Sequence, residues 1–191
     1  PLGSVAAAAG GLLTGAFYGL AASYAQGLGL SASEVATLVA ATILGGALFQ
    51  WPVGHYSDTR DRRVVLLWVC TLGALIAGAS YALPALGGTS RILLAVLLGG
   101  AMFAIYGLCV AHTNDEVDST RLVEFTSGLL LIHGAGAALG PTIAGTVMDL
   151  AGSASLMLYF AVVLAALALY TIKRLNTLPP IPTEEKATFV A

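Results

Sequence analysis

The 191-residue sequence predicts an all-α membrane protein with six membrane-spanning helices. The chain is 58% hydrophobic and 9% charged, with a mean hydropathy of +0.89, whereas a soluble domain carries about 25% charged residues. Six long apolar runs follow one another, each near the roughly 20 residues that a helix needs to cross a bilayer. Transmembrane strands are shorter and alternate in polarity. We therefore expect every run to be a helix.

Polar breaks separate the six runs. The first run carries no charged residue, and Ser31 and Glu34 have capping-box spacing at the start of the second. The second run stops at the polar loop 55–63 and the fourth at the hydrophilic stretch 112–121, whose acids at 114–118 we expect to be solvated rather than to bind a cation. The expected spans form a bundle over residues 1–175, followed by a polar cytoplasmic tail at 176–191; they cover about 2–25, 32–54, 64–82, 92–111, 122–148 and 155–173.

The basic residues are divided unequally between the two sides of the membrane. With six spans, the loops after the second and fourth spans share a side with both termini. Seven of the eight Lys and Arg residues fall on that side, and only Arg91 falls on the other. The positive-inside rule then predicts that both termini are cytoplasmic. The seven are Arg60, Arg62, Arg63, Arg121, Lys173, Arg174 and Lys186.

Several functional classes are disfavoured by composition and motifs. A net charge of −2 argues against a nucleic-acid partner. The two cysteines lie inside apolar runs without the spacing of a metal or disulfide motif, so no metal is expected. No nucleotide-binding glycine loop, ordered catalytic set or cofactor motif is present, and we expect neither a cofactor nor an enzyme.

Glycines recur at four-residue spacing on two of the predicted helices. Gly11, Gly15 and Gly19 share one face of the first, and Gly136 and Gly140 share one face of the fifth. This small-xxx-small pattern lets helix backbones touch. The alternative is that glycine is simply common in membrane helices.

The segment GHYSDTRDRR, residues 54–63, places an acid among basic residues directly after a glycine. A loop that only sets topology needs the arginines but not Asp58. Asp58 can accept hydrogen bonds from a helix N-terminus or pair with an arginine. Arg62 and Arg63 can reach carboxylates, carbonyls or anionic lipid headgroups.

This segment resembles the signature loop of the major facilitator superfamily, approximately G-x-L-[SA]-D-[RK]-x-[GD]-R-[RK]. Tyr56 and Thr59 depart from the pattern, so the role of the first basic residue has either passed to Arg60 or been lost. In the superfamily the loop is a cytoplasmic latch. The resemblance implies a cytoplasmic gate formed by Gly54, Asp58, Arg60, Arg62 and Arg63, with Ser57 and Asp61 also matching the pattern.

The segment GAALGPTIAG, residues 136–145, resembles the glycine–proline motif of export-type members of the superfamily. Pro141 removes one backbone hydrogen bond and bends a helix, and glycines permit close contact with a partner helix. The resemblance implies a kinked pivot helix. The alternative is a proline kink with no pivoting role. The residues concerned are Gly136, Gly140, Pro141 and Gly145.

Nearly the whole chain resembles the C-terminal six-helix half of bacterial drug-efflux-like members, the YcaD-type branch in particular. The resemblance implies a 3+3 repeat bundle in the bacterial inner membrane that pairs with a second six-helix half in a parent protein, a homodimer or a heteromer, surrounded by lipid. It implies secondary active transport by alternating access. The alternative is a non-transporting membrane scaffold or accessory subunit that keeps the fold.

In the superfamily the first and fourth helices of each half line the solute cavity. Aromatic residues with few charges favour a small amphipathic or apolar solute. His133 is an ionisable group near the middle of a span, which suggests proton exchange; the alternative is a neutral imidazole bonded to a hydroxyl or carbonyl. The candidate solute or proton residues are Thr14, Phe17, Tyr18, Tyr24, Phe103, Tyr106 and His133.

Overall fold

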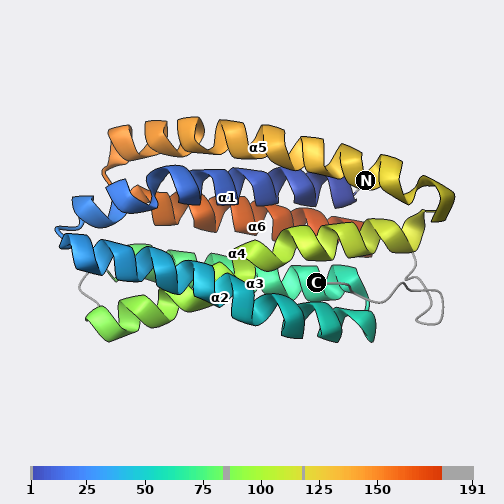
Figure 1. Cartoon of the computed structure of the whole chain (residues 1–191), viewed down its shortest axis with the longest axis horizontal. Helices are drawn as coiled ribbons and strands as arrows, with labels where there is room; N and C mark the ends of the chain where they lie inside the picture. The colour runs from blue at the N-terminus through green and yellow to red at the C-terminus, as the bar shows by residue number, and fades with distance from the viewer. Residues whose placement is uncertain (1, 84–86, 118, 178–191) are drawn as a thin grey trace.

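The computed structural model describes residues 2–83, 87–117 and 119–177 and contains six long helices and one short 3-10 helix in these ranges. All six long helices are long and apolar enough to cross a membrane. The expected all-α class is therefore confirmed (Figure 1). The elements are α1 (Leu2–Gly27), α2 (Ala32–Asp58), α3 (Arg62–Ala82), α4 (Gly88–Glu116), η1 (Ser119–Arg121), α5 (Leu122–Ala151) and α6 (Ser155–Leu175).

The helices form a bundle with a front layer of four and a back layer of two. In the front layer α5 packs along α1, α1 contacts α4, and α4 packs along α2. In the back layer α3 and α6 pack on each other and cover α4 and α1 (Figure 1). The start of α1 and the end of α6 lie at the same end as the α2–α3 turn, which we call the Arg62 end; the opposite end is the Arg91 end.

The two glycine sets that the sequence singled out pack against each other. A Cβ atom at Gly11 or Gly15 would clash with a backbone carbonyl oxygen of α5. A Cβ atom at Gly136 or Gly140 would likewise clash with a carbonyl oxygen of α1. The backbones of α1 and α5 are therefore in direct contact, as small-xxx-small faces allow.

A second crossing of the same kind joins α2 to α4. A Cβ atom at Gly45 would fall on the carbonyl oxygen of Val96, and one at Gly99 on that of Thr42. The two crossings are equivalent if α1–α3 and α4–α6 are two repeats: the first helix of each repeat crosses the second helix of the other. This arrangement is the 3+3 bundle that the resemblance implied.

All six helices are longer than the expected spans, and α2 and α4 exceed them by the most. α2 continues to Asp58, four residues past the expected end at 54, and α4 covers 88–116 rather than 92–111. Polar side chains near these ends bond to the backbone of their own helix: Ser57 donates to the Gly54 carbonyl oxygen at 2.6 Å, and Thr113 donates to that of Cys109 at 3.0 Å. The expected tail falls mostly on residues 178–191, outside the described residues.

Local capping confirms the expected capping box and adds a second cap that the sequence analysis did not predict. The Glu34 carboxylate accepts hydrogen bonds from the backbone N–H and the hydroxyl of Ser31, at 2.8 and 2.6 Å. Asp61 accepts from the backbone N–H of Arg63 at 2.9 Å and so caps the start of α3. Each cap fixes where its helix begins.

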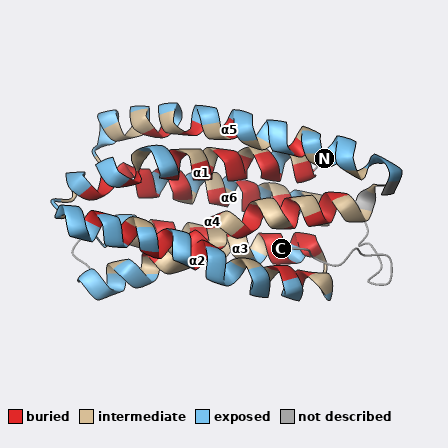
Figure 2. Ribbon diagram, viewed as in Figure 1, coloured by how far each residue is buried: buried red, intermediate tan, exposed pale blue. Residues whose placement is uncertain are grey.

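Burial is distributed unevenly over the front layer (Figure 2). α1 is buried along most of its length because α4, α5 and α6 surround it. α5 is covered mainly by α1, and buries only the stripe Leu129, Gly136, Gly140 and Ala144. Most of its remaining surface is apolar and faces outward, which suits lipid or a second bundle.

The glycine crossing predicts a difference between two alanine substitutions. Gly15→Ala should lower the free energy of unfolding by about 1–3 kcal/mol, because the new methyl group meets the Ala137 backbone. Gly134→Ala, on α5 with nothing near its Cβ position, should be neutral or stabilising. Detergent unfolding followed by circular dichroism measures both, and equal effects would contradict the crossing.

Candidate functional site

The buried guanidinium of Arg62 joins three helices at one end of the bundle. Its side chain is 1% exposed and donates to the Asp58 carboxylate at 3.0 Å and to the Ser57 hydroxyl at 3.0 Å. Its Nε donates to the Asp115 carboxylate at 2.6 Å. Asp58 ends α2, Arg62 begins α3 and Asp115 lies near the end of α4. We call these four residues the Arg62 cluster.

The Arg62 cluster is a charge-assisted network that is shielded from water. A buried cation is costly unless it is paired and hydrogen-bonded, and here two carboxylates flank it. Because the guanidinium group of arginine stays protonated in proteins, the cluster acts as a fixed clamp between α2, α3 and α4.

The remaining predicted gate residues lie around this clamp. Arg63 pairs with Asp61 at 2.8 Å, within the α2–α3 turn. The guanidinium of Arg60 lies over the Tyr56 ring, 5.4 Å from its centroid. Gly54 is buried in the last turns of α2. The structure thus brings Asp58 and Arg62 together across helices, while Arg60 and Arg63 contact residues of their own segment.

Asp115 corrects an expectation. The sequence suggested a solvated loop acid, but its side chain is 2% exposed and bonded to Arg62. α4 continues through this residue, and Leu108, Ala111 and His112 precede it on a buried stripe of the same helix. Extending helical periodicity past residue 111 would have placed Asp115 on the inner face.

Three predicted aromatic residues form one cluster across α1 and α4. The ring centroids of Phe17 and Tyr18 are 5.3 Å apart, and each lies 5.9 Å from that of Phe103. Phe17 is buried, whereas Tyr18 is 65% exposed. The cluster therefore offers aromatic surface beside the junction of α1 and α4, and we call it the aromatic surface.

His133, Thr14 and Tyr106 form a second group. The Nδ1 atom of His133 lies 3.2 Å from the carbonyl oxygen of Ala7, and its Nε2 atom lies 3.4 Å from the Thr14 hydroxyl oxygen. The imidazole and the Tyr106 ring are 4.6 Å apart between centroids. His133 thus connects α5 with both α1 and α4. A hydroxyl and a carbonyl are the partners that the sequence analysis named for His133 in its alternative, a neutral imidazole.

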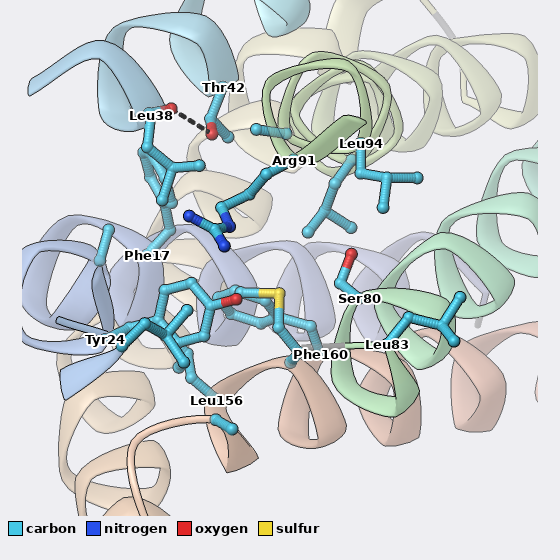
Figure 3. A pocket seen from close by; sticks show the side chains of 16 residues that line it. Phe17, Tyr24, Leu38, Thr42, Ser80, Leu83, Arg91, Leu94, Leu156 and Phe160 are labelled. Atoms are coloured by element: carbon cyan, nitrogen blue, oxygen red, sulfur yellow. Dashed lines mark hydrogen bonds between the residues drawn. The ribbon is translucent and has the colours of Figure 1, made fainter. Parts of the chain in front are cut away.

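Tyr24 lies apart from the other candidates. It lines a narrow cavity of about 50 Å³ between α1, α2, α3, α4 and α6, together with Arg91 and Ser80 (Figure 3). Drug-sized ligands occupy pockets of roughly 300–1,000 Å³. This cavity is too small for such a solute, and Phe17 is the one candidate that it shares with the aromatic surface.

The glycine–proline segment contacts α1 over part of its length. Gly136 and Gly140 touch the α1 backbone, and a Cβ atom at Gly19 would lie 3.1 Å from the Pro141 ring. At Gly145 the nearest atom to an added Cβ would be 4.0 Å away, in Leu20. α5 runs through Pro141 as one helix, so the kink and the pivot stay predictions.

Comparisons with known proteins agree with this fold. The family model described as Major Facilitator Superfamily matches residues 3–190. The chain is 32% identical over 143 residues to the uncharacterized MFS-type transporter YE1530 of Yersinia enterocolitica, and 31% identical over 144 residues to the uncharacterized MFS-type transporter YcaD of Shigella flexneri. Each alignment covers 73% of this chain and 35% of the relative.

The chain belongs to the major facilitator superfamily, a family of membrane transporters, and it resembles its YcaD-type members. It is a multi-pass membrane protein with the all-α architecture of one transporter half. The chain spans about a third of the length of the curated relatives that it matches. These relatives are named as transporters rather than as enzymes.

The Arg62 cluster predicts that removing one carboxylate charge strongly lowers the stability of the bundle. Asp115→Asn should lower the free energy of unfolding by about 3 kcal/mol, because it removes one of two carboxylates from a buried cation. Glu124→Gln is the control, since its pair with Arg121 is exposed and contributes less than about 1 kcal/mol. Detergent unfolding measures both. If Asp115→Asn left the free energy of unfolding unchanged, the cluster would not act as a clamp.

Proposed function

We propose that the chain is one six-helix half of a secondary transporter that moves a small amphipathic or apolar solute by alternating access. The solute meets the aromatic surface, and a second six-helix half covers that face. The partner half belongs to the same parent protein, to a second copy or to another subunit. Family membership supports transport, and the aromatic surface supports the solute class.

The aromatic surface carries this proposal. Phe17, Tyr18 and Phe103 come from α1 and α4, the first helices of the two repeats, and Tyr106 follows Phe103 by three residues on the same helix. Aromatic rings bind apolar groups, and a tyrosine hydroxyl adds one polar contact. Arg91 is the charged residue that lines the nearby cavity, and one charged side chain among mostly apolar ones suits a weakly charged solute better than a sugar phosphate.

The charge distribution supports an orientation with both termini in the cytoplasm of a bacterial cell. The Arg62 end holds Arg60, Arg62, Arg63, Arg121, Lys173 and Arg174, and the opposite end holds Arg91. The positive-inside rule assigns the first set to the cytoplasmic face of an inner membrane. The Arg62 cluster then lies at the cytoplasmic end, where the latch of the family is expected.

The packing supports motion between bundles rather than within this one. One backbone-to-backbone crossing ties α1 to α5, the other crossing and the buried ion cluster tie α2, α3 and α4 together, and α1 packs on α4. Such a body moves as a unit, and alternating access becomes a rocking of two units about a shared solute site. The pivot in this proposal is the segment around Pro141, at the exposed edge helix α5.

The partner is tested by the mass of the purified assembly. The chain has a mass of 19.3 kDa, and we expect a protein component of at least two six-helix units in native mass spectrometry from detergent. A chain that stays a stable monomer at every detergent concentration would contradict the pairing.

Transport is tested with the amphipathic aromatic dye Hoechst 33342 in vesicles that contain the purified assembly. Tyr18→Ala should reduce dye movement about five- to tenfold, the factor that corresponds to about 1–1.4 kcal/mol of lost aromatic contact. Trp68→Ala is the matched control, because Trp68 is equally exposed at 61% but lies on α3 in the back layer. Equal losses in both variants would argue against the aromatic surface.

The same measurement separates transport from a scaffold role. An assembly that moves no dye but purifies with a stoichiometric membrane protein would contradict the transport proposal and support the accessory subunit instead.

A further inference from the structure

Both ring nitrogens of His133 face oxygen atoms of α1. Nδ1 lies 3.2 Å from the carbonyl oxygen of Ala7, which can only accept a hydrogen bond. Nε2 lies 3.4 Å from the hydroxyl oxygen of Thr14, which can accept or donate. The direction of the Thr14 hydroxyl therefore decides how many protons the ring can hold.

The single hydroxyl proton of Thr14 has three competing acceptors, the carbonyl oxygens of Gly10 and Gly11 and the Nε2 atom of His133. The carbonyl oxygen of Gly10 lies at 2.9 Å, closer than Nε2 of His133 at 3.4 Å. When Thr14 donates to Gly10, its lone pairs face Nε2, and both ring nitrogens then face acceptors. An imidazolium satisfies this arrangement because it carries two N–H donors, whereas a neutral imidazole carries one.

The neutral ring fits after one rotation. The Thr14 hydroxyl turns to donate to Nε2, while Nδ1–H keeps its bond to Ala7 and Gly10 loses its side-chain donor. The site therefore accommodates both protonation states of His133 without backbone movement. The protonated state has one more hydrogen bond than the neutral state.

The groups that contact the imidazole are neutral in the part of the chain that the structure describes. α1 contributes the Ala7 carbonyl and the Thr14 hydroxyl. α4 contributes the titratable Tyr106, and three residues further on the Cys109 thiol donates to the Gly3 carbonyl oxygen at 2.9 Å. A proton bound at His133 thus creates a new charge at this junction, and the face of the Tyr106 ring favours a cation.

We propose that His133 is an exchangeable proton-binding site at the junction of α1, α4 and α5. The ring is half-buried within the bundle, and in the proposed transporter water in the cavity between the two halves supplies the proton. The proton adds to the lone pair of Nε2 without breaking a bond of the ring and returns to water by the same route. One consequence rests on the proposed function: in a secondary transporter, the proton bound here is the coupling ion.

Histidine imidazole NMR tests the proton site directly. The full chain, with isotope-labelled histidine, is placed in phospholipid nanodiscs and titrated between about pH 5 and 8, the range where histidine titrates. We expect one reversible transition between a ring with one N–H and a ring with two. The His133 signals are assigned by their loss in His133→Gln, and His55 and His112 serve as internal references.

Thr14 supplies the sharper test. Thr14→Val should reduce the ratio of doubly to singly protonated His133 at a fixed pH about fivefold, the factor for one hydrogen bond of about 1 kcal/mol. Thr14→Ser should restore it. Thr146→Val is the matched control, because Thr146 also donates to the carbonyl four residues earlier but is exposed.

A His133 ring that stays in one protonation state across the titration would overturn the proposal, as would equal effects of Thr14→Val and Thr146→Val. Hoechst 33342 movement in vesicles under an imposed pH gradient then tests the coupling. If dye movement responds to the pH gradient and His133→Gln abolishes that response, the coupling is supported. If the response is the same in His133→Gln, the coupling is overturned. Absent transport with an intact titration would refute the transporter but support the proton site.

Discussion

The direct backbone contact between α1 and α5 is the constraint on which the rest of this structure depends. Gly11 and Gly15 leave no room for a side chain, so α5 approaches α1 closely enough for the His133 ring to reach the Ala7 carbonyl and the Thr14 hydroxyl. A bulkier residue at either glycine would move the imidazole away from both. The glycines therefore position the His133 side chain as well as allowing the two helices to pack closely.

The second crossing and the Arg62 cluster extend this rigidity to the other helices. Without a hydrophobic driving force inside a bilayer, helices associate through close packing and polar contacts. Here α2 and α4 use glycines along their length, and the ends of α2, α3 and α4 use the bonds of Arg62 to Asp58 and Asp115.

Much of this architecture follows from local sequence signals. Length and hydropathy predict the six helices, and the position of Asp58 shortly before Arg62 suggests their pairing. Contacts between distant segments were harder to predict. Asp115 lies 53 residues from Arg62, so their bond depends on how α3 and α4 pack, which no local pattern encodes. Tyr24 was predicted to belong to the same solute site as Tyr18 and Phe103, but α1 has several neighbours, and Tyr24 lines the narrow cavity beside Arg91 instead.

Arg62 and His133 show two ways of holding an ionisable side chain inside an apolar bundle. Arg62 is flanked by two carboxylates and keeps its proton, so its charge is permanent and its role is mechanical. The contacts of His133 in the described part of the chain are neutral, so nothing there fixes its charge in advance. A side chain can change its charge inside a bundle only if neighbouring groups can adjust their hydrogen bonds. In the proposed proton site, the Thr14 hydroxyl adjusts by rotating between the Gly10 carbonyl and the imidazole ring. The fixed charge therefore suits the clamp at the bundle end, and the variable one suits the junction beside the aromatic surface.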